Sequence, residues 1–162
     1  MKPVFARLRS YMLKACFPLA ILALHNYAQA QRLSGKQEKY FQQEILKYIN
    51  GYRADKGLAA LVLDENLSRI SYAHSLDMSV GNVAFGHGGF RDRMVKARLS
   101  NSKMSGFAEN VAYGMQSPQE VSQEWYASPG HKKNILGPYL LTGIGVERGD
   151  GGYLYFTQVF ER

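Results

Sequence analysis

The stretch Ser-Pro-Gly-His-Lys-Lys-Asn-Ile-Leu at 128–136, read with Phe-Ala-Glu-Asn-Val at 107–111, carries most of the information in this sequence. It places an imidazole, His131, and a carboxylate, Glu109, each at the edge of a predicted regular segment. A third such point is Phe-Gly-His-Gly-Gly at 85–89, which contains His87. Histidines and acids presented from glycine-bordered loops usually converge on a cleft rather than fill a core. These three residues are therefore the candidate site.

The first 30 residues have the pattern of a secretory signal peptide. A basic start with Lys2 and Lys14 precedes an apolar run over 15–24, and Ala28-Gln29-Ala30 matches a small-residue cleavage site. The apolar run is too short to span a bilayer permanently. We expect cleavage near Ala30 and secretion, either periplasmic or extracellular, with a retained anchor as the alternative. The mature protein would then have no transmembrane segment.

Removing residues 1–30 changes what the composition implies. The 162-residue chain has a formal net charge of +7, and the segment carries four basic and no acidic residues, so 16 basic against 13 acidic residues remain, or +3. The basicity is largely a targeting signal, and we expect no nucleic-acid partner. Cys16 is the only cysteine and leaves with the segment, so the mature chain has no disulfide and no thiolate ligand. The remaining length suits one domain.

The hydrophobic pattern predicts helices early in the chain and strands late. Residues 31–39 are interpreted as a polar lead-in. Helices are predicted from residue 40, after the N-cap Asp64, over 91–99, and after the cap-then-proline pairs 117–118 and 128–129. Strands are predicted over 107–113, 142–148 and 153–160, the last two as a hairpin. His74 lies on the apolar face of the second helix, and the fold class is α+β.

A series of motifs in this order resembles the CAP superfamily, in its bacterial SCP-like branch. The motifs are Ile-Leu-x-x-Ile-Asn-x-Tyr-Arg (45–53), Ala-His-Ser-x-x-Met (73–78), His87, Ala-Glu-Asn-Val (108–111), Glu-Trp (124–125), Ser-Pro-Gly-His-x-x-Asn-Ile-Leu (128–136) and Tyr-Phe-Thr-Gln-Val-Phe (155–160). The resemblance assigns residues 40–162 to one CAP domain. It implies a three-layer α-β-α sandwich with a small antiparallel sheet and a cleft lined by histidines and acids.

Carried over by the resemblance, the cleft residues are His87, Glu109 and His131. Two positions depart from the pattern of many animal and plant relatives. Tyr155 stands where those relatives have a histidine in the last strand, and Ser128 stands where they have a second glutamate. The four-residue site of those relatives is therefore incomplete, and His131 could replace part of it. His74 and Tyr155 are candidates for residues just behind the cleft, where they would support the cleft side chains without contacting the ligand.

The chemistry of the three cleft residues leaves several functions open. Two neutral imidazoles, His87 and His131, with the Glu109 carboxylate form the ligand set of many zinc sites, so a divalent cation such as zinc is a candidate cofactor. Alternatively, Glu109 and His131 form a buried hydrogen-bonded pair that joins strand to helix. If the protein is an enzyme, Glu109 and His131 are its candidate acid–base residues. Ser128 is better explained as an N-cap than as a nucleophile.

Three classes of function follow. The leading one is a secreted binding module whose cleft takes a small ligand, with a lipid or sterol allowed by the resemblance, or a divalent cation. The second is a metal-assisted hydrolase acting on an envelope polymer or peptide, and the third is a structural or interaction domain without a catalytic site. The basic residues Arg91, Arg93, Lys96, Arg98, Lys103, Lys132 and Lys133 are interpreted as a solvated surface, the alternative being docking on anionic envelope groups.

Overall fold

A computed structural model of the protein describes residues 32–162, of which residues 33–162 form one compact unit. The predicted signal peptide at 1–30 lies outside the described residues. The helices are α2 (Gly35–Ala54), α3 (Glu65–Ser79), α4 (Phe90–Ser100), α5 (Pro118–Ala127) and α6 (Pro129–Ile135). The strands are β1 (Val62–Leu63), β2 (Phe107–Tyr113), β3 (Leu141–Arg148) and β4 (Leu154–Glu161). Among residues 32–162 no helix is long and apolar enough to cross a membrane.

The strands form a single sheet in the order β1-β3-β4-β2. β2 and β3 each pair antiparallel with β4, and the predicted hairpin of β3 and β4 is present. β1 pairs parallel with β3, with Val62 opposite Leu141, so the sheet is mixed rather than purely antiparallel as expected. The difference comes from two residues at the end of the apolar link 58–63, which are too few to show a strand period. β2 is left as an edge strand.

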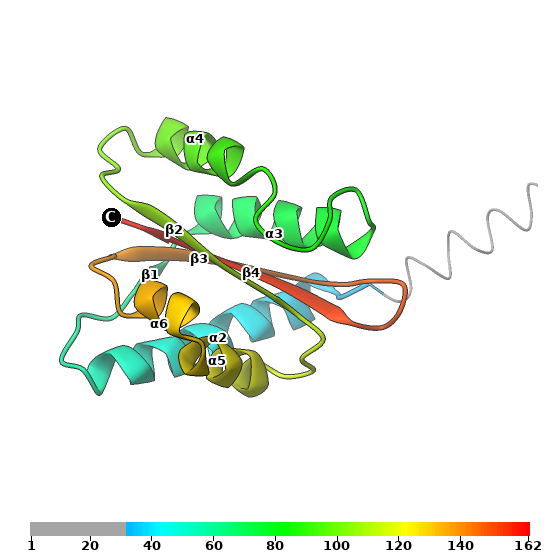
Figure 1. Ribbon diagram of the computed structural model, residues 1–162, viewed down its shortest axis with the longest axis horizontal. Helices are drawn as coiled ribbons and strands as arrows, with labels where there is room; N and C mark the ends of the chain where they lie inside the picture. The colour runs from blue at the N-terminus through cyan, green and yellow to red at the C-terminus, as the bar shows by residue number, and fades with distance from the viewer. Residues whose placement is uncertain (1–31) are drawn as a thin grey trace, which may run out of the picture. The chain divides into compact units, whose positions relative to one another are not determined.

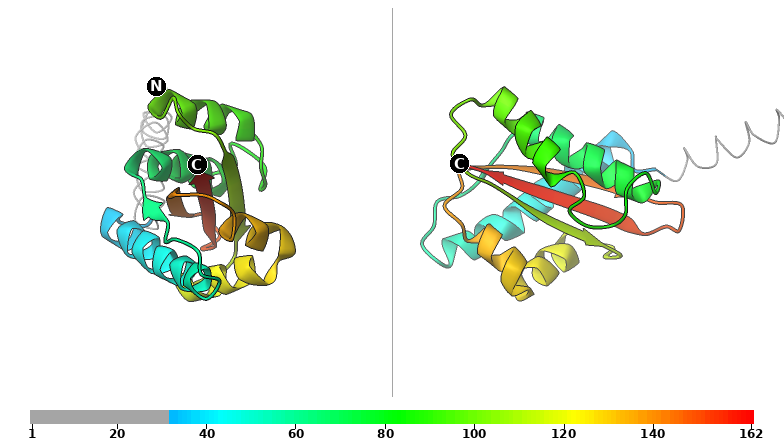
Figure 2. Two further views of the ribbon diagram at one scale, coloured as in Figure 1. Left: turned by 90° about the vertical axis from the view of Figure 1, so that its left-hand side faces the viewer. Right: turned by 45° about the horizontal axis from the view of Figure 1, so that its top comes forward.

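Helices cover both faces of the sheet, which confirms the α+β class and the three-layer sandwich. α3 and α4 lie on one face, and α2, α5 and α6 lie on the other (Figures 1 and 2). Because successive strand residues point to opposite faces, each strand feeds both layers. In β4, Phe156 and Phe160 enter the core beneath α2 and α5, whereas Val159 enters a smaller core with Leu67 of α3 and Ala97 of α4.

Local capping signals set the helix starts. α2 begins at Gly35, earlier than the predicted residue 40, because Ser34 and Gln37 form a capping box. Ser117 accepts a hydrogen bond from the Glu120 N–H and caps α5 as predicted. Ser128 occupies the N-cap position of α6, but its side chain makes no capping hydrogen bond. Pro129, at the first helical position, favours the start of α6 instead.

α3 packs very close to β3 because the residues at the contact are small, glycines on β3 and serines on α3. A Cβ added at Gly145 would lie 2.1 Å from the Tyr72 nitrogen, and one at Gly143 would lie 2.0 Å from the Leu67 carbonyl carbon. The Ser71 hydroxyl donates to the Gly143 carbonyl at 3.1 Å, and the Ser75 hydroxyl donates to the Gly145 carbonyl at 3.0 Å. This close approach fixes the height of α3 above the sheet and therefore the position of His74.

Arg53, at the end of α2, is a second buried anchor on the opposite face. Its guanidinium donates to four carbonyl oxygens, those of Ala59, Ile135, Gly137 and Tyr139, at 2.7–3.1 Å. Burial lowers the pKa of Arg53 from its ordinary value. Since arginine stays protonated in proteins, the charge remains and joins α2 to the chain that follows α6.

Replacing Gly145 by alanine is expected to destabilise the protein by about 1–3 kcal/mol or more, because the new methyl group overlaps the backbone of α3. The matched control is Gly51→Ala in α2, where a Cβ meets nothing within 4 Å. That control is expected to gain up to about 1 kcal/mol from helix propensity. Urea unfolding of both variants measures the difference, and equal midpoints would contradict the close-packing interpretation.

Candidate functional site

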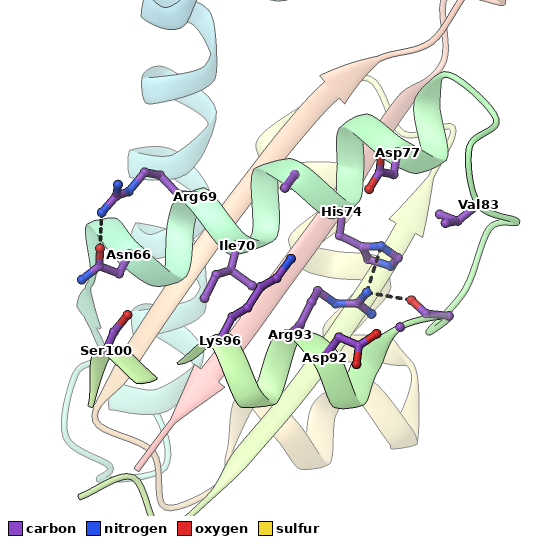
Figure 3. A pocket seen from close by; sticks show the side chains of 13 residues that line it. Asn66, Arg69, Ile70, His74, Asp77, Val83, Asp92, Arg93, Lys96 and Ser100 are labelled. Carbon is purple, nitrogen blue, oxygen red and sulfur yellow. Dashed lines mark hydrogen bonds between the residues drawn. The ribbon is translucent and has the colours of Figure 1, made fainter. Parts of the chain in front are cut away.

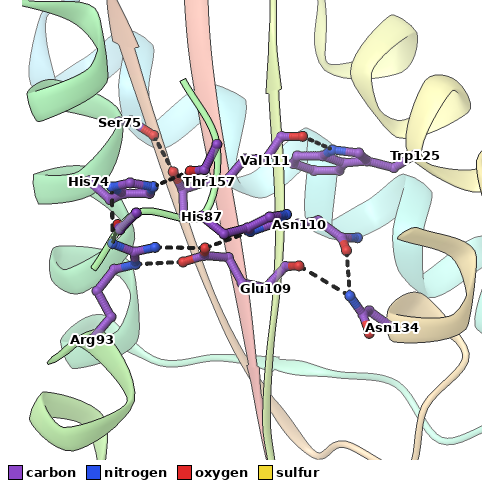
Figure 4. A network of polar contacts seen from close by, with 12 residues as sticks. His74, Ser75, His87, Arg93, Glu109, Asn110, Val111, Trp125, Asn134 and Thr157 are labelled. Carbon is purple, nitrogen blue, oxygen red and sulfur yellow. Dashed lines mark hydrogen bonds and ion pairs between the residues drawn. The ribbon is translucent and has the colours of Figure 1, made fainter. Parts of the chain in front are cut away.

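Glu109 lies at the centre of a buried charge network at the β2 edge of the sheet (Figure 4). Its side chain points toward the α3–α4 layer and is fully buried. Arg93 of α4 binds both carboxylate oxygens, with Nε 2.6 Å from Oε2 and Nη2 2.7 Å from Oε1. A buried carboxylate needs such a partner, and the two-pronged guanidinium geometry is among the strongest available.

Arg93 corrects one expectation from the sequence. It was grouped with the solvated basic residues, yet it is buried. Besides Glu109, its Nη1 donates to the Gly88 carbonyl at 2.7 Å and contacts His74 Nδ1 at 3.1 Å. A single guanidinium therefore joins β2, α3, α4 and the loop that carries His87.

His87 is the exposed end of this network. Its Nδ1 lies 2.9 Å from Glu109 Oε1, and 53% of its side chain is exposed. The predicted proximity of His87 and Glu109 is therefore observed. With Nδ1 held by the carboxylate, the second ring nitrogen, Nε2, is the atom left for an incoming group.

His74 faces inward as predicted and contacts the loop that carries His87. Its Nε2 lies 2.9 Å from the Gly86 carbonyl, while Arg93 Nη1 lies at Nδ1. Because the guanidinium can only donate, Nδ1 must accept, so His74 is neutral with its proton on Nε2. Burial lowers the pKa of His74, and the Arg93 charge lowers it further against the opposing effect of the Gly86 hydrogen bond.

His131 reaches the site from the other layer, on α6. Its backbone carbonyl accepts from Asn110 at 3.3 Å, and its Nδ1 is buried without a hydrogen-bond partner among residues 32–162. Burial lowers the pKa of His131, and the nearby His87 lowers it further. The carboxylate of Glu109 is bonded to Arg93 and His87, so the pairing of Glu109 with His131, considered as an alternative above, is not the one formed.

Asparagines make the hydrogen bonds between strand β2 and helix α6 instead. Asn134 Nδ2 donates to Asn110 Oδ1 at 2.8 Å and to the Glu109 carbonyl at 3.1 Å. The other candidate from the sequence, Tyr155, lies opposite Tyr113 across the β2–β4 pair, and the two rings stack with centroids 5.7 Å apart. Tyr155 therefore belongs to an aromatic cluster at the end of the sheet.

The geometry of the described residues does not fit a three-ligand metal site. No group of three or more His, Cys, Asp or Glu side chains within 32–162 is placed to hold an ion. Both oxygens of Glu109 already accept hydrogen bonds from Arg93, so a cation at Glu109 would have to displace a buried guanidinium. His87 and His131 remain the only two imidazoles of this part of the chain that could approach an ion from the surface.

Comparison with known proteins identifies the family of this chain. A sequence profile described as the cysteine-rich secretory protein family, CAP, matches residues 46–160. The chain belongs to the CAP family. It is 35% identical over 122 residues to the uncharacterized protein YkwD of Bacillus subtilis, an alignment that covers 73% of this chain and 46% of YkwD. The CAP chain thus spans about half the length of the curated relative it matches.

Solved structures agree with this assignment. An extracellular protein with an SCP domain from Bacillus anthracis superimposes with a TM-score of 0.66 at 28% identity, covering 80% of this chain and 44% of that one. An outer surface protein of Borrelia burgdorferi superimposes with a TM-score of 0.69 at 17% identity, covering 81% of this chain and 96% of that one. The second likeness shows the fold alone.

Sequence reasoning missed Arg93 and Asn134 as parts of this CAP-domain site. A usable signal existed for Arg93, because it is spaced four residues from the buried Ala97 on one face of α4. A strand acid such as Glu109 also requires a cation when both faces of its sheet are covered. Asn134 lies within the Ser-Pro-Gly-His motif, but nothing in the sequence indicates that its amide bonds to β2.

Arg93→Met is expected to destabilise the protein by about 3–5 kcal/mol, because it leaves the Glu109 carboxylate buried without its cation. The double variant Arg93→Met/Glu109→Gln is expected to lose less than the sum of the two single variants. Arg91→Met, on the exposed side of the same helix, is the control and should stay within about 0.5 kcal/mol. Chemical denaturation measures the unfolding free energy of all four variants. If the losses of the two single variants added up in the double variant, the pairing of Arg93 with Glu109 would be contradicted.

Acidification below about pH 6.5 is expected to destabilise the protein through His74 and His131. Both have a lowered pKa in the folded state, so the unfolded chain takes up protons first as the pH falls. In His74→Gln the unfolding free energy should therefore fall less between about pH 7 and about pH 5 than in the wild type. Denaturation curves at the two pH values measure this slope whatever the absolute stability.

Glu38 of α2 is a control, because it should change the pH dependence of the unfolding free energy in the opposite direction. Burial, and then the nearby Glu147, raise the pKa of Glu38 to about 7. The folded state therefore holds a proton on Glu38 that the unfolded state releases, and this stabilises the protein as the pH falls toward about 5. Glu38→Gln should make the acid loss steeper. If both variants changed the slope in the same direction, the assignment would be wrong.

Proposed function

We propose that this CAP-domain protein is a secreted, non-catalytic binding module that attaches to polar groups of the cell envelope through the surface around His87 and His131. The observation that carries the proposal is the state of Glu109. Its carboxylate is buried and fully bonded to Arg93 and His87, so it serves as the anchor of the exposed imidazole. Glu109 is therefore not free to act as a general base, and the imidazole of His87, with its free Nε2, is the group left to contact a ligand.

The bonding of Glu109 to Arg93 also makes a metal-assisted hydrolase the weaker alternative. A Lewis-acid mechanism needs a cation with an open coordination position, and Glu109 would be its only carboxylate ligand in the predicted set. The bidentate bond to Arg93 competes directly with that role. Displacing the guanidinium would also break its hydrogen bond to the Gly88 carbonyl and its contact with His74, so exchanging it for a metal ion has a structural cost as well.

The compartment and the ligand class rest on separate support. The signal-peptide pattern of residues 1–30 and the extracellular naming of the Bacillus anthracis neighbour favour export. For the ligand, the side chains offered at this surface are the imidazoles of His87 and His131, and 53% of the His87 side chain is exposed. Such polar groups favour a polar envelope component over the lipid or sterol that the family resemblance allowed.

The proposal predicts binding to purified cell-wall sacculi without release of soluble fragments. Co-sedimentation measures the bound fraction, and analysis of the supernatant over time measures hydrolysis. The double variant His87→Ala/His131→Ala should lose most of the binding, whereas Arg91→Gln, an exposed change elsewhere, should keep it. Failure of the wild-type protein to co-sediment would refute the envelope-binding role.

The same assay separates the hydrolase. Soluble fragments that disappear with Glu109→Gln, in a variant confirmed to be folded, would establish catalysis instead. We expect no change in binding with EDTA or added zinc, since the described residues bring no three metal ligands together. Binding that chelator abolishes and zinc restores would revive the metal-assisted interpretation.

A further inference from the structure

Four aromatic side chains gather at the end of the sheet where β3 turns into β4, and we call them the aromatic platform. Tyr113 is at their centre, with ring centroids 4.7 Å from Phe85, 6.5 Å from Tyr153 and 5.7 Å from Tyr155. About half of each of three rings is exposed, 48% of Phe85, 50% of Tyr113 and 54% of Tyr153. Apolar side chains that are exposed singly are ordinary, whereas a contiguous group of them marks a binding surface.

The platform is built on fixed parts of the fold. Tyr113 ends β2, and Tyr155 lies directly opposite it in β4. The turn after β3 packs against Tyr155, since a Cβ added at Gly149 would lie 2.9 Å from its ring. The Gly149 N–H donates to the Tyr153 carbonyl at 2.9 Å, which holds Tyr153 at the start of β4. Rings that are held before a ligand arrives lower the entropic cost of binding.

The platform continues into the His87 surface along one face of β2. Glu109 and Tyr113 point to the same face because side chains alternate along a strand, and four residues separate them by about 13 Å. The loop that carries His87 follows this face, since Phe85 contacts Tyr113 while His87 bonds to Glu109. An elongated ligand on this face can therefore contact the rings and the exposed imidazole together.

The imidazole selects the polar groups of that ligand. The Glu109 carboxylate, paired with Arg93, can only accept hydrogen bonds, so a neutral His87 carries its proton on Nδ1. Nε2 then accepts, and the ligand must supply an O–H or N–H donor there. Tyr113 and Tyr153 add phenolic hydroxyls that can both donate and accept. The surface therefore suits a ligand that combines apolar C–H faces with many hydrogen-bonding groups.

The open shape of the platform argues against a lipid or sterol, because such ligands bind in concave sites that bury most of their surface. A hollow of about 520 Å³ between α3 and α4 lies beside the His87 loop, but none of the four platform rings lines it (Figure 3). A second hollow, of about 410 Å³, is lined by residues of α2 and α3 and likewise by none of these rings. A flat ring can stack on such an open surface, whereas an alkyl chain would stay largely in water.

We propose that the aromatic platform binds a glycan strand, with sugar rings stacked on Phe85, Tyr113 and Tyr153 and a hydroxyl or amide N–H of the same strand donated to His87 Nε2. A sugar ring has an apolar C–H face and a rim of hydroxyl groups, which matches the rings and the polar groups of this surface. The proposal rests on the envelope-binding role, because it names the chemical class bound there as carbohydrate rather than peptide or lipid.

The test titrates the mature protein with chitotetraose, a neutral tetramer of N-acetylglucosamine, and follows backbone amide shifts by NMR. Saturable shifts are expected at residues 85–87, 113 and 153–155. Tetra-alanine and short-chain phosphatidylcholine micelles are the comparison probes, and neither should shift these residues. No saturable shift with chitotetraose, or shifts of the same residues with either comparison probe at equal concentration, would overturn the proposal.

Single-ring variants test the stacking. Tyr113→Ala and Tyr153→Ala should each weaken chitotetraose binding about fivefold, as expected for the loss of one ring contact. Tyr113→Phe keeps the ring and should retain most of the affinity. The matched control is Tyr40→Ala in α2, which removes a tyrosine that is 57% exposed and whose ring meets only Phe41 edge-on. Tyr153 precedes the first paired residue of β4, so its variant tests the platform even if Tyr113→Ala unfolds. Unchanged affinity in Tyr153→Ala, or an equal loss in Tyr40→Ala, would contradict the assignment.

Competition with sacculi separates the glycan assignment from the envelope-binding role. Chitotetraose should release the wild-type protein from sacculi in the co-sedimentation assay. If sacculi bind the protein but chitotetraose neither binds nor competes, the glycan assignment is wrong and the envelope-binding role stands. If chitotetraose binds at the platform but sacculi do not sediment the protein, the envelope-binding role is wrong and the platform is still a carbohydrate site.

Discussion

The arrangement of the site depends on one constraint, the burial of the Glu109 carboxylate inside a sheet covered on both faces. A charge in that position is tolerated only with a cation that satisfies both oxygens, and Arg93 supplies it with two hydrogen bonds. The remaining Arg93 donor, Nη1, then reaches Gly88 and His74, so the glycine loop and the first layer of helices are fixed by the same group. The exposed imidazole of His87 is held as a consequence.

This arrangement separates two roles that the sequence left combined. The buried part, consisting of Glu109, Arg93 and His74, is a structural network with its hydrogen bonds in place. The outer part consists of the exposed His87 and the neighbouring, partly buried His131, which approach from opposite layers at the edge strand. Since β2 is an edge strand, residues from above and below the sheet can meet there without a channel through the core. The recognition proposed for that edge would use few groups, and their positions are set by buried ones.

Local signals predicted most of the fold. The cap at Asp64, the Ser-Pro helix start at 117–118 and the Gly-rich hairpin turn act within a few residues, so they can be identified without knowledge of the tertiary structure. β1 could not be predicted, because two residues show no period and its pairing with β3 spans a long loop of chain. Of the site, the proximity of His87 to Glu109 was expected from the family resemblance, whereas the partner of Glu109 was not. Arginines are usually exposed, and the sequence offers several on the same helix.

Arg53 has a consequence for the environment in which this protein works. Small secreted domains often hold their chain ends together with disulfides, whose survival depends on the redox state of the surroundings. Here a guanidinium bonded to four carbonyl oxygens joins the end of α2 to residues 135–139, and the only cysteine of the chain is Cys16. The cross-link within 33–162 is therefore electrostatic, and reducing agents or thiol exchange leave it intact.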